Sequence, residues 1–118
     1  MRSLTILLTL ILTAVIAPAA DISGKWTFQV ETSAGSGSPT FVIEQKGEAL
    51  TGSYSGALGE AKIRGTVKGD QITIEFDVEG GGQAAKIEYK GTIESDTKMK
   101  GTVKLGSFGE GTWTGARQ

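Results

Sequence analysis

Gly24-Lys25-Trp26 opens the first alternating stretch of this chain with a glycine, a polar residue and a large apolar residue. The same order recurs at Gly52-Ser53-Tyr54, Gly65-Thr66-Val67, Gly91-Thr92-Ile93, Gly101-Thr102-Val103 and Gly111-Thr112-Trp113. In a β-strand, residues i and i+2 face the same side. Each copy therefore places a missing side chain and a bulky one on one face, as the inner wall of a small barrel requires.

The first twenty residues are typical of a secretory signal peptide. Arg2 supplies the positive start, residues 4–16 are an apolar run, and Ala17-Pro18-Ala19 offers a cleavage site. The run is shorter than the ~20 residues that a membrane-spanning helix needs, so an uncleaved anchor is the weaker alternative. We therefore expect a signal peptide at 1–20, one domain at 21–118, and a secreted or periplasmic protein with no membrane partner after cleavage.

Charge and composition restrict the partners of the mature domain. Without Arg2, 11 basic and 13 acidic residues leave a net charge of −2, and no basic patch is evident. This argues against nucleic acid and anionic membranes as partners. The chain has no cysteine, so no disulfide can support the fold.

After residue 20 the hydrophobic period is two, which predicts an all-β domain. We expect strands at 22–31, 39–46, 49–56, 60–68, 71–78, 84–94, 98–105 and 109–117. A flexible Gly-Ser loop at 32–38 and a glycine-rich loop at 79–83 are the longest connections. Counting back from the tight turns pairs Arg64 with Glu75, Lys62 with Asp77, Glu88 with Lys104, and Glu94 with Lys98 across neighbouring strands.

Short connections between all neighbours predict an eight-stranded antiparallel up-and-down (meander) β-barrel. Closure removes the two unpaired edges that an open sheet would leave, and a two-sheet sandwich is the lower-ranked alternative. The register places Gly101 opposite Gly91 and Trp113, so that the indole has a gap to fill. It also brings an inward Arg117 close to Trp26, where the guanidinium can lie over the indole face.

The pattern Gly24-x-Trp26 on the first strand, closed by Arg117 from the last, resembles that of calycins, the group of lipocalins, fatty-acid-binding proteins and avidins. Further segments resemble the start of an avidin: Leu50-Thr51-Gly52-Ser53-Tyr54 and Gly59-Glu60-Ala61. The avidin pattern implies a ligand-binding role for Tyr54. It has Asn and Ser where this chain has Phe28 and Gly56, so biotin is not implied. The mature chain is also similar in texture to small β-domains appended to secreted bacterial hydrolases.

The two ends of the expected barrel differ. One end, the loop end, carries the 32–38 loop, Leu58-Gly59, the 79–83 loop and residues 106–108; the other, the terminal end, carries both chain termini. The resemblance to calycins implies a ligand at the end away from Trp26, which is the loop end. The candidate ligand-binding residues there are Val30, Phe41, Tyr54, Leu58, Phe76, Ile87, Leu105 and Phe108, while Gly24, Trp26 and Arg117 are assigned to structural closure. Such an apolar mouth suits a small hydrophobic or amphipathic molecule, although inward apolar residues also serve as an ordinary filled core.

Several chemistries lack their residues. With no histidine or cysteine, nucleophile triads, most zinc sites and haem ligation are excluded. Glu75, Asp77 and Glu79 share an outward strand face, which indicates a solvated surface better than a calcium site. We therefore expect no catalytic residues, no metal, no cofactor and no enzymatic activity. Two functions remain: binding of a small apolar ligand, or an accessory domain with a filled core that acts on a protein partner through its loops, as an inhibitor or as part of a hydrolase.

Overall fold

The computed structural model describes residues 21–80 and 83–118, so the predicted signal peptide lies outside the described residues. The elements are β1 Gly24–Thr32, β2 Gly35–Gly37, β3 Thr40–Lys46, β4 Ala49–Gly56, β5 Gly59–Lys68, β6 Gln71–Gly80, β7 Gln83–Ser95, β8 Lys98–Leu105, the single-turn 3-10 helix η1 Gly106–Phe108, and β9 Glu110–Arg117. The barrel strands follow the period-two pattern of the sequence, and glycine-containing turns at Gly47-Glu48 and Gly69-Asp70 join β3 to β4 and β5 to β6.

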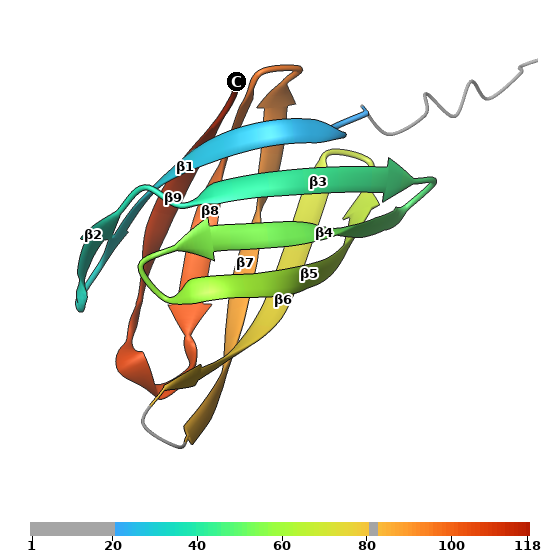
Figure 1. The fold of residues 1–118 in the computed structure, drawn as a ribbon. Helices are drawn as coiled ribbons and strands as arrows, with labels where there is room; N and C mark the ends of the chain where they lie inside the picture. Colours follow the sequence, from blue (N-terminus) through green and yellow to red (C-terminus); the bar gives the residue numbers. More distant parts are fainter. Residues whose placement is uncertain (1–20, 81–82) are drawn as a thin grey trace, which may run out of the picture.

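The strands form one closed antiparallel sheet, which confirms the predicted eight-stranded up-and-down barrel. Strands β1 and β3 to β9 pair in sequence order, and β1 pairs with β9 to complete the circle. The closing register runs from Trp26 opposite Arg117 to Thr32 opposite Gly111. Strand β2 lies outside this circle as a short hairpin extension of β1 (Figure 1).

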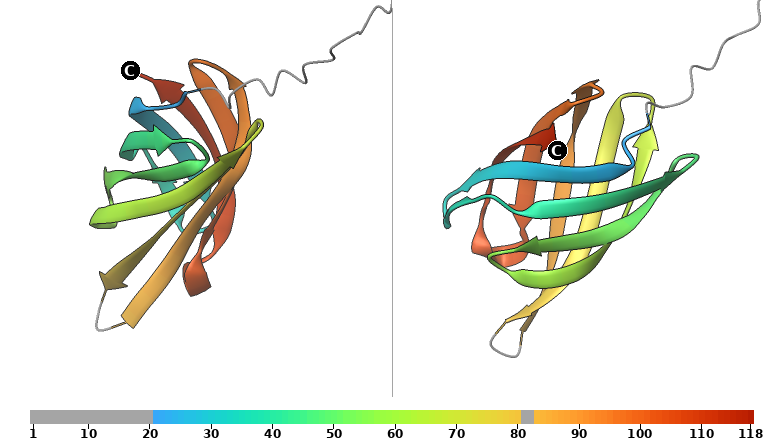
Figure 2. Two further views of the ribbon diagram at one scale, coloured as in Figure 1. Left: turned by 90° about the vertical axis from the view of Figure 1, so that its right-hand side faces the viewer. Right: turned by 45° about the horizontal axis from the view of Figure 1, so that its top comes forward.

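The barrel is flattened, and its two walls cross. Strands β1, β3 and β4 run across the front of the molecule, while β7, β8 and β9 run steeply behind them (Figure 1). The turned views show the same crossing from the side and from above (Figure 2). Strongly twisted strands that coil around one core produce this arrangement. Hairpin β1–β2, the β4–β5 turn and η1 lie at the loop end, opposite the C-terminus.

The inward residues of every strand form a single core. Most of the large apolar side chains on the inward faces are buried, and Trp26, Phe28, Phe41, Ile74, Phe76 and Ile87 have no exposed surface. Val78 and Leu105 are partly buried and pack against this core. Among the described residues no polar or charged residue is buried. A chain without disulfides is held by this burial.

Glycines in the wall admit the backbone of the neighbouring strand. A Cβ atom at Gly101 would lie 1.8 Å from the carbonyl oxygen of Lys90, and one at Gly52 would lie 1.8 Å from that of Val42. Glycine at such points lets a sheet bend tightly enough to close. Gly101 does face Gly91 and Trp113 as predicted. The Trp113 ring, however, packs over Gly91, where an added Cβ would lie 2.7 Å from Cζ2, while the Lys90 carbonyl fills the space at Gly101.

Two predicted connections and one predicted cross-strand pair need correction. The 32–38 segment is hairpin β1–β2 and not a flexible loop, because Thr32 pairs with Gly35 and Val30 with Gly37. Strands β6 and β7 extend to Gly80 and Gln83, into the predicted 79–83 loop. The predicted pair Glu94–Lys98 is not formed, because the register shifts between Ile93 and Ser95. Lys98 lies opposite Ser95, and the Lys100 amine approaches the Glu94 carboxylate at 3.5 Å.

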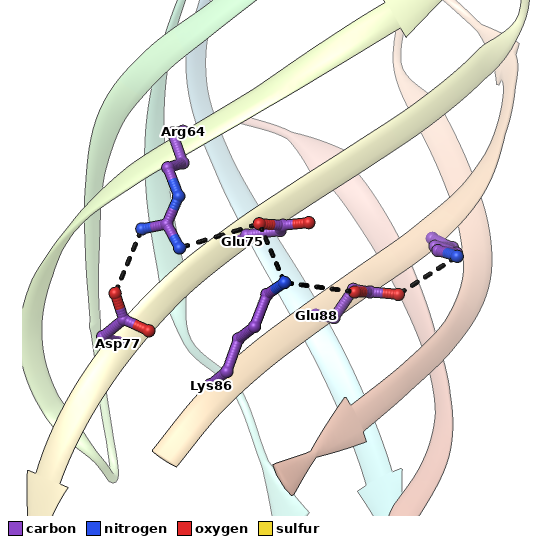
Figure 3. Close-up of polar contacts among 6 residues, drawn as sticks. Arg64, Glu75, Asp77, Lys86 and Glu88 are labelled. Carbon is purple, nitrogen blue, oxygen red and sulfur yellow. Dashed lines mark hydrogen bonds and ion pairs between the residues drawn. The ribbon is translucent and has the colours of Figure 1, made fainter. Parts of the chain in front are cut away.

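Charged side chains line up on the outer faces of β5, β6 and β7 (Figure 3). The predicted pairs Arg64–Glu75 and Glu88–Lys104 are in register, and the Arg64 guanidinium lies 3.6 Å from the Glu75 carboxylate. The predicted Lys62–Asp77 pair is absent from the β5–β6 ladder, which ends at Arg64 and Glu75. Asp77 instead lies 3.2 Å from Arg64.

Lys86 occupies the centre of this surface network. Glu75 and Glu88 face each other across β6 and β7, and the Lys86 amine lies 3.4 Å from the first and 4.0 Å from the second. The amine offsets repulsion between the two carboxylates. Exposed pairs of this kind contribute little free energy of folding, so we assign the network to register and solubility.

Arg117 closes the terminal end. Its guanidinium donates hydrogen bonds to the backbone carbonyls of Asp21, Ser23 and Asp96, at 2.8, 2.5 and 2.7 Å. The absence of a side chain at Gly24 makes room for it, since a Cβ there would lie 2.9 Å from Nη1. The Trp26 indole donates to the Ile22 carbonyl at 2.9 Å. These bonds tie the segment before β1 to the end of β9.

Candidate functional site

A cavity of about 150 Å³ opens at the loop end of the barrel. Its walls come from the ends of β1 and β8, from β2, from the β4–β5 turn, and from inward tyrosines of β4 and β7. The lining residues are Val30, Thr32, Ala34, Gly35, Ser36, Gly37, Pro39, Tyr54, Ala57, Leu58, Tyr89 and Leu105. Carbon atoms make up most of the surface that lines the cavity, so its interior is mainly apolar.

Half of the eight candidate ligand-binding residues predicted from the sequence line the cavity. Val30, Tyr54, Leu58 and Leu105 line it. Phe41, Phe76 and Ile87 are fully buried and do not line it; they lie in the core. Phe108 belongs to η1, and its side chain lies outside what the structure describes. The strand parity placed these residues on the inner face, but it carried no information on how far each lies from the opening.

Sequence reasoning missed Tyr89, the β1–β2 hairpin, Pro39 and Ala57 as lining residues of the cavity. Tyr89 lies in the middle of β7, opposite Ile74 and Val103. Its long side chain nevertheless borders the cavity. A signal was present in the sequence, because a tyrosine on an inward face needs somewhere to place its hydroxyl.

The hairpin wall is built by local hydrogen bonds of the Gly-Ser segment. The Thr32 hydroxyl donates to the Gly35 carbonyl at 2.9 Å and accepts from the Ala34 amide at 3.1 Å. The Ser38 hydroxyl donates to the side-chain oxygen of Gln29 at 2.8 Å. Side-chain bonds of this kind favour a tight turn in a segment whose composition otherwise suggests flexibility. They fix β2 as a side wall of the cavity.

Aromatic rings from six strands fill the barrel beneath the cavity. Phe28 stacks on Trp113 with ring centroids 4.4 Å apart and planes at 9°, and Tyr54 stacks on Phe76 at 4.4 Å and 24°. Phe41 contacts Phe28, Tyr54, Phe76 and Tyr89. The barrel therefore has a packed middle and an unfilled loop end, and both of the interiors considered from the sequence occur in one molecule.

Two tyrosines bring phenol hydroxyl groups to the site, in addition to the hydroxyl groups of Thr32 and Ser36. The Tyr54 hydroxyl accepts a long hydrogen bond, 3.4 Å, from the Leu58 amide. Burial raises the pKa of Tyr54, although this hydrogen bond opposes the rise. Burial also raises the pKa of Tyr89, and the neighbouring Tyr54 acts in the same direction. Both phenols therefore remain neutral O–H groups over the physiological pH range.

Charge is missing from the site. None of the described residues that line the cavity is Lys, Arg, Asp or Glu. No cluster of three or more potential metal-ligating side chains occurs within residues 21–80 and 83–118. The same residues contain no helix long and apolar enough to cross a membrane.

Because its described lining is uncharged, the cavity can hold an uncharged molecule by apolar contact and by hydrogen bonds to hydroxyl groups.

The described residues also form hollows on the outer wall, of which two are compared with the cavity. The larger, about 540 Å³, follows β7 to β9 around the paired glycines Gly91 and Gly101, with exposed Lys and Thr side chains at its rim. The smaller, about 320 Å³, lies between Thr27, Glu94 and Lys98. Both are lined largely by outward side chains of the sheet, so a molecule in either would keep much of its contact with water. The loop-end cavity is the better candidate because it reaches inside the barrel.

No protein-family model and no curated protein matches this chain. Solved structures do. A redesigned β-barrel has a TM-score of 0.68 at 17% identity over 82% of this chain and 91% of its own. A de novo designed fluorescence-activating β-barrel has a TM-score of 0.65 at 17% identity over 87% of this chain and 100% of its own. The redesigned barrel mFAP1, bound to DFHBI, has a TM-score of 0.63 at 15% identity over 82% and 94%. At such identities the likeness establishes the closed antiparallel barrel fold alone.

Proposed function

We propose that this protein is a secreted or periplasmic, non-enzymatic barrel that binds a small, mainly apolar molecule in its loop-end cavity. The observation that carries the proposal is the cavity itself, which is lined by Val30, Tyr54 and Leu105 and reaches the inside of a barrel that is otherwise packed. Ligand sites are typically concave and apolar with a few polar groups, as this one is.

The volume limits the size of the ligand. A buried apolar cavity of about 150 Å³ in another protein binds benzene. The cavity here has a similar volume, about 150 Å³, and also has a mouth. A single six-membered ring with a short substituent fits it, whereas a long acyl chain or a fused four-ring system does not. The structural neighbours that are bound to DFHBI support the view that a barrel of this fold can hold a small ligand.

The test uses cumene, a ring with one branched substituent, as the probe. Titration followed by NMR should give saturable binding with a dissociation constant on the order of 0.1–1 mM, as expected for nine heavy atoms. Leu105→Trp fills the cavity and should weaken binding more than about tenfold. Val42→Trp adds the same ring at an exposed position, 43% accessible, on the outside of β3 and should change nothing.

Absence of saturable cumene binding by the wild-type protein would contradict the proposal. So would equal affinities of wild-type and Leu105→Trp proteins, provided that both are folded by circular dichroism.

A second candidate function is an accessory domain that contacts a protein partner through the loop end. It is favoured by Leu58, which is 41% exposed at the rim of the cavity, and by the packed aromatic middle of the barrel. Native mass spectrometry of protein purified from its host separates the candidates. An added mass of a few hundred daltons or less supports the small ligand, and co-purification of a second chain supports the accessory role.

A further inference from the structure

The hydroxyl group of Tyr89 is the least satisfied polar group of the interior. The residue is 2% exposed, and within residues 21–80 and 83–118 its hydroxyl takes part in no hydrogen bond. A hydroxyl on a residue with so little exposed surface has little access to water, so its bonding capacity is left for a partner that reaches it. A position of this kind points either to a role or to a molecule that supplies the missing bond.

Four rings enclose the ring of Tyr89. Their centroids lie 5.7 Å away for Phe28, 5.3 Å for Phe41, 6.1 Å for Phe76 and 5.8 Å for Trp113. Because the ring of Tyr89 is surrounded by apolar groups, only its hydroxyl can contact a polar partner.

The hydroxyl borders the cavity. Among the described residues, every fully enclosed side-chain nitrogen or oxygen atom has a hydrogen-bond partner. Because the Tyr89 hydroxyl has none there, it is not fully enclosed. Tyr89 lines the loop-end cavity, and that cavity is the open space available to it.

Tyr54 adds a second hydroxyl with a defined direction. Its oxygen already accepts a bond from the Leu58 amide, so its hydrogen is the part left to donate. Gly56 leaves room for it, since an added Cβ there would lie 2.7 Å from the hydroxyl oxygen. A phenol is also a better donor than acceptor, because its lone pair is delocalised into the ring. The two tyrosines therefore offer donors to the cavity.

We propose that the loop-end cavity selects a neutral, ring-sized molecule that carries a hydrogen-bond acceptor, such as an aryl ketone or aldehyde, and that Tyr89 donates the bond to that acceptor. The inference rests on the proposed function and narrows its ligand class. A carboxylate is disfavoured, because no cationic side chain among the described lining residues would pair with it.

The experiment compares acetophenone with cumene, which has the same number of heavy atoms and no acceptor. Affinities are measured by calorimetry or NMR for the wild-type protein and for Tyr89→Phe. For each probe, the affinity for Tyr89→Phe is compared with the affinity for the wild-type protein. The hydration of a free probe is the same in both measurements, so differences in hydration between the two probes cancel. We expect Tyr89→Phe to weaken acetophenone roughly five- to tenfold, the usual worth of one hydrogen bond, and to change cumene by less than about twofold.

Benzoate supplies the charge control. It should bind the wild-type protein at least about tenfold more weakly than acetophenone, since its charge would be buried without a partner. Benzoate binding as tight as acetophenone overturns the requirement for a neutral ligand.

The outcomes separate the two proposals. Cumene binding with acetophenone unaffected by Tyr89→Phe overturns the acceptor inference and leaves the binding function standing. Failure of both probes to bind the wild-type protein overturns the binding function itself.

A second readout needs no variant. Carbonyl-labelled acetophenone bound to the wild-type protein should show a C=O stretching frequency lower than in hexane, because donation from a hydroxyl weakens that bond. A frequency equal to the value in hexane overturns the inference.

Discussion

The guanidinium of Arg117 lies over the indole of Trp26, with its central carbon 4.8 Å from the ring centroid. The two residues face each other in the ladder that closes the barrel. One side of the guanidinium contacts the aromatic face, and its N–H groups bond the carbonyls of Asp21, Ser23 and Asp96. A single side chain thus joins the first segment, the last strand and the β7–β8 turn, and it closes the end away from the cavity.

Removal of this side chain should cost stability. We expect Arg117→Ala to lower the free energy of unfolding by about 2 kcal/mol, from lost charge-assisted hydrogen bonds and the cation–π contact. Urea denaturation measures the change. Arg64→Ala is the control, because Arg64 makes only exposed ion pairs and should cost less than about 1 kcal/mol. Equal losses for the two variants would show that Arg117 is an ordinary surface arginine.

Gly101 should not tolerate a side chain. A Cβ at this position would lie 1.8 Å from the Lys90 carbonyl oxygen, so the backbone of β7 or β8 must move. We expect Gly101→Ala to destabilise the protein by more than about 2 kcal/mol, and Gly101→Val by more still. Gly37→Ala is the control, since no atom lies within 4 Å of a Cβ there. Thermal melts in which both alanine variants match the wild type would refute the close approach of β7 and β8.

The tyrosines should make the protein sensitive to alkali. An acid whose pKa is raised on folding contributes stability that is complete below its unfolded pKa, about 10 for tyrosine, and that falls as the pH rises from there toward the folded pKa. Because burial raises the pKa of Tyr54 and of Tyr89, stability should fall above about pH 10. The slope reaches up to about 1.4 kcal/mol per pH unit for Tyr89 and is smaller for Tyr54, where the hydrogen bond from Leu58 opposes the rise.

Phenolate absorbance near 295 nm checks this prediction, since the chain has two tyrosines in all. The absorbance should appear together with loss of the native circular dichroism, and Tyr89→Phe should flatten the dependence of stability on pH. Lysine titration is common to both proteins and cancels in the comparison. A phenolate step near pH 10 in the folded protein would contradict the buried environment of both rings.

The fold was predictable from the sequence because its main determinant is local. Alternation assigns each residue to a face, and two-residue turns such as Gly69-Asp70 fix the register between the strands that they join. Closure of the barrel then places Arg117 near Trp26, and the two residues do pair in the closing ladder. Features that depend on strand curvature did not follow. The register shift near Ser95 and the packing of Trp113 over Gly91, beside Gly101, arise where the sheet bends.

The candidate site was predictable only in part, for a related reason. Parity separates inward from outward residues but does not say how high a side chain reaches along the axis. Phe41 and Phe76 lie low, within the aromatic cluster, whereas Tyr89 reaches the cavity from the middle of its strand. The β2 wall was missed because the Gly-Ser composition of residues 32–38 suggests flexibility, while the hydrogen bonds of Thr32 order it.

Isotope-filtered NOE spectroscopy of labelled protein with acetophenone tests the location of the ligand most directly. Binding in the loop-end cavity predicts NOEs from the probe to the methyl groups of Val30 and Leu105 and to the ring of Tyr89, which together line that cavity. NOEs confined to the methyl groups of Thr102 and Thr112, at the outer hollow, would contradict it, as would the absence of any NOE to the three cavity residues at saturating probe.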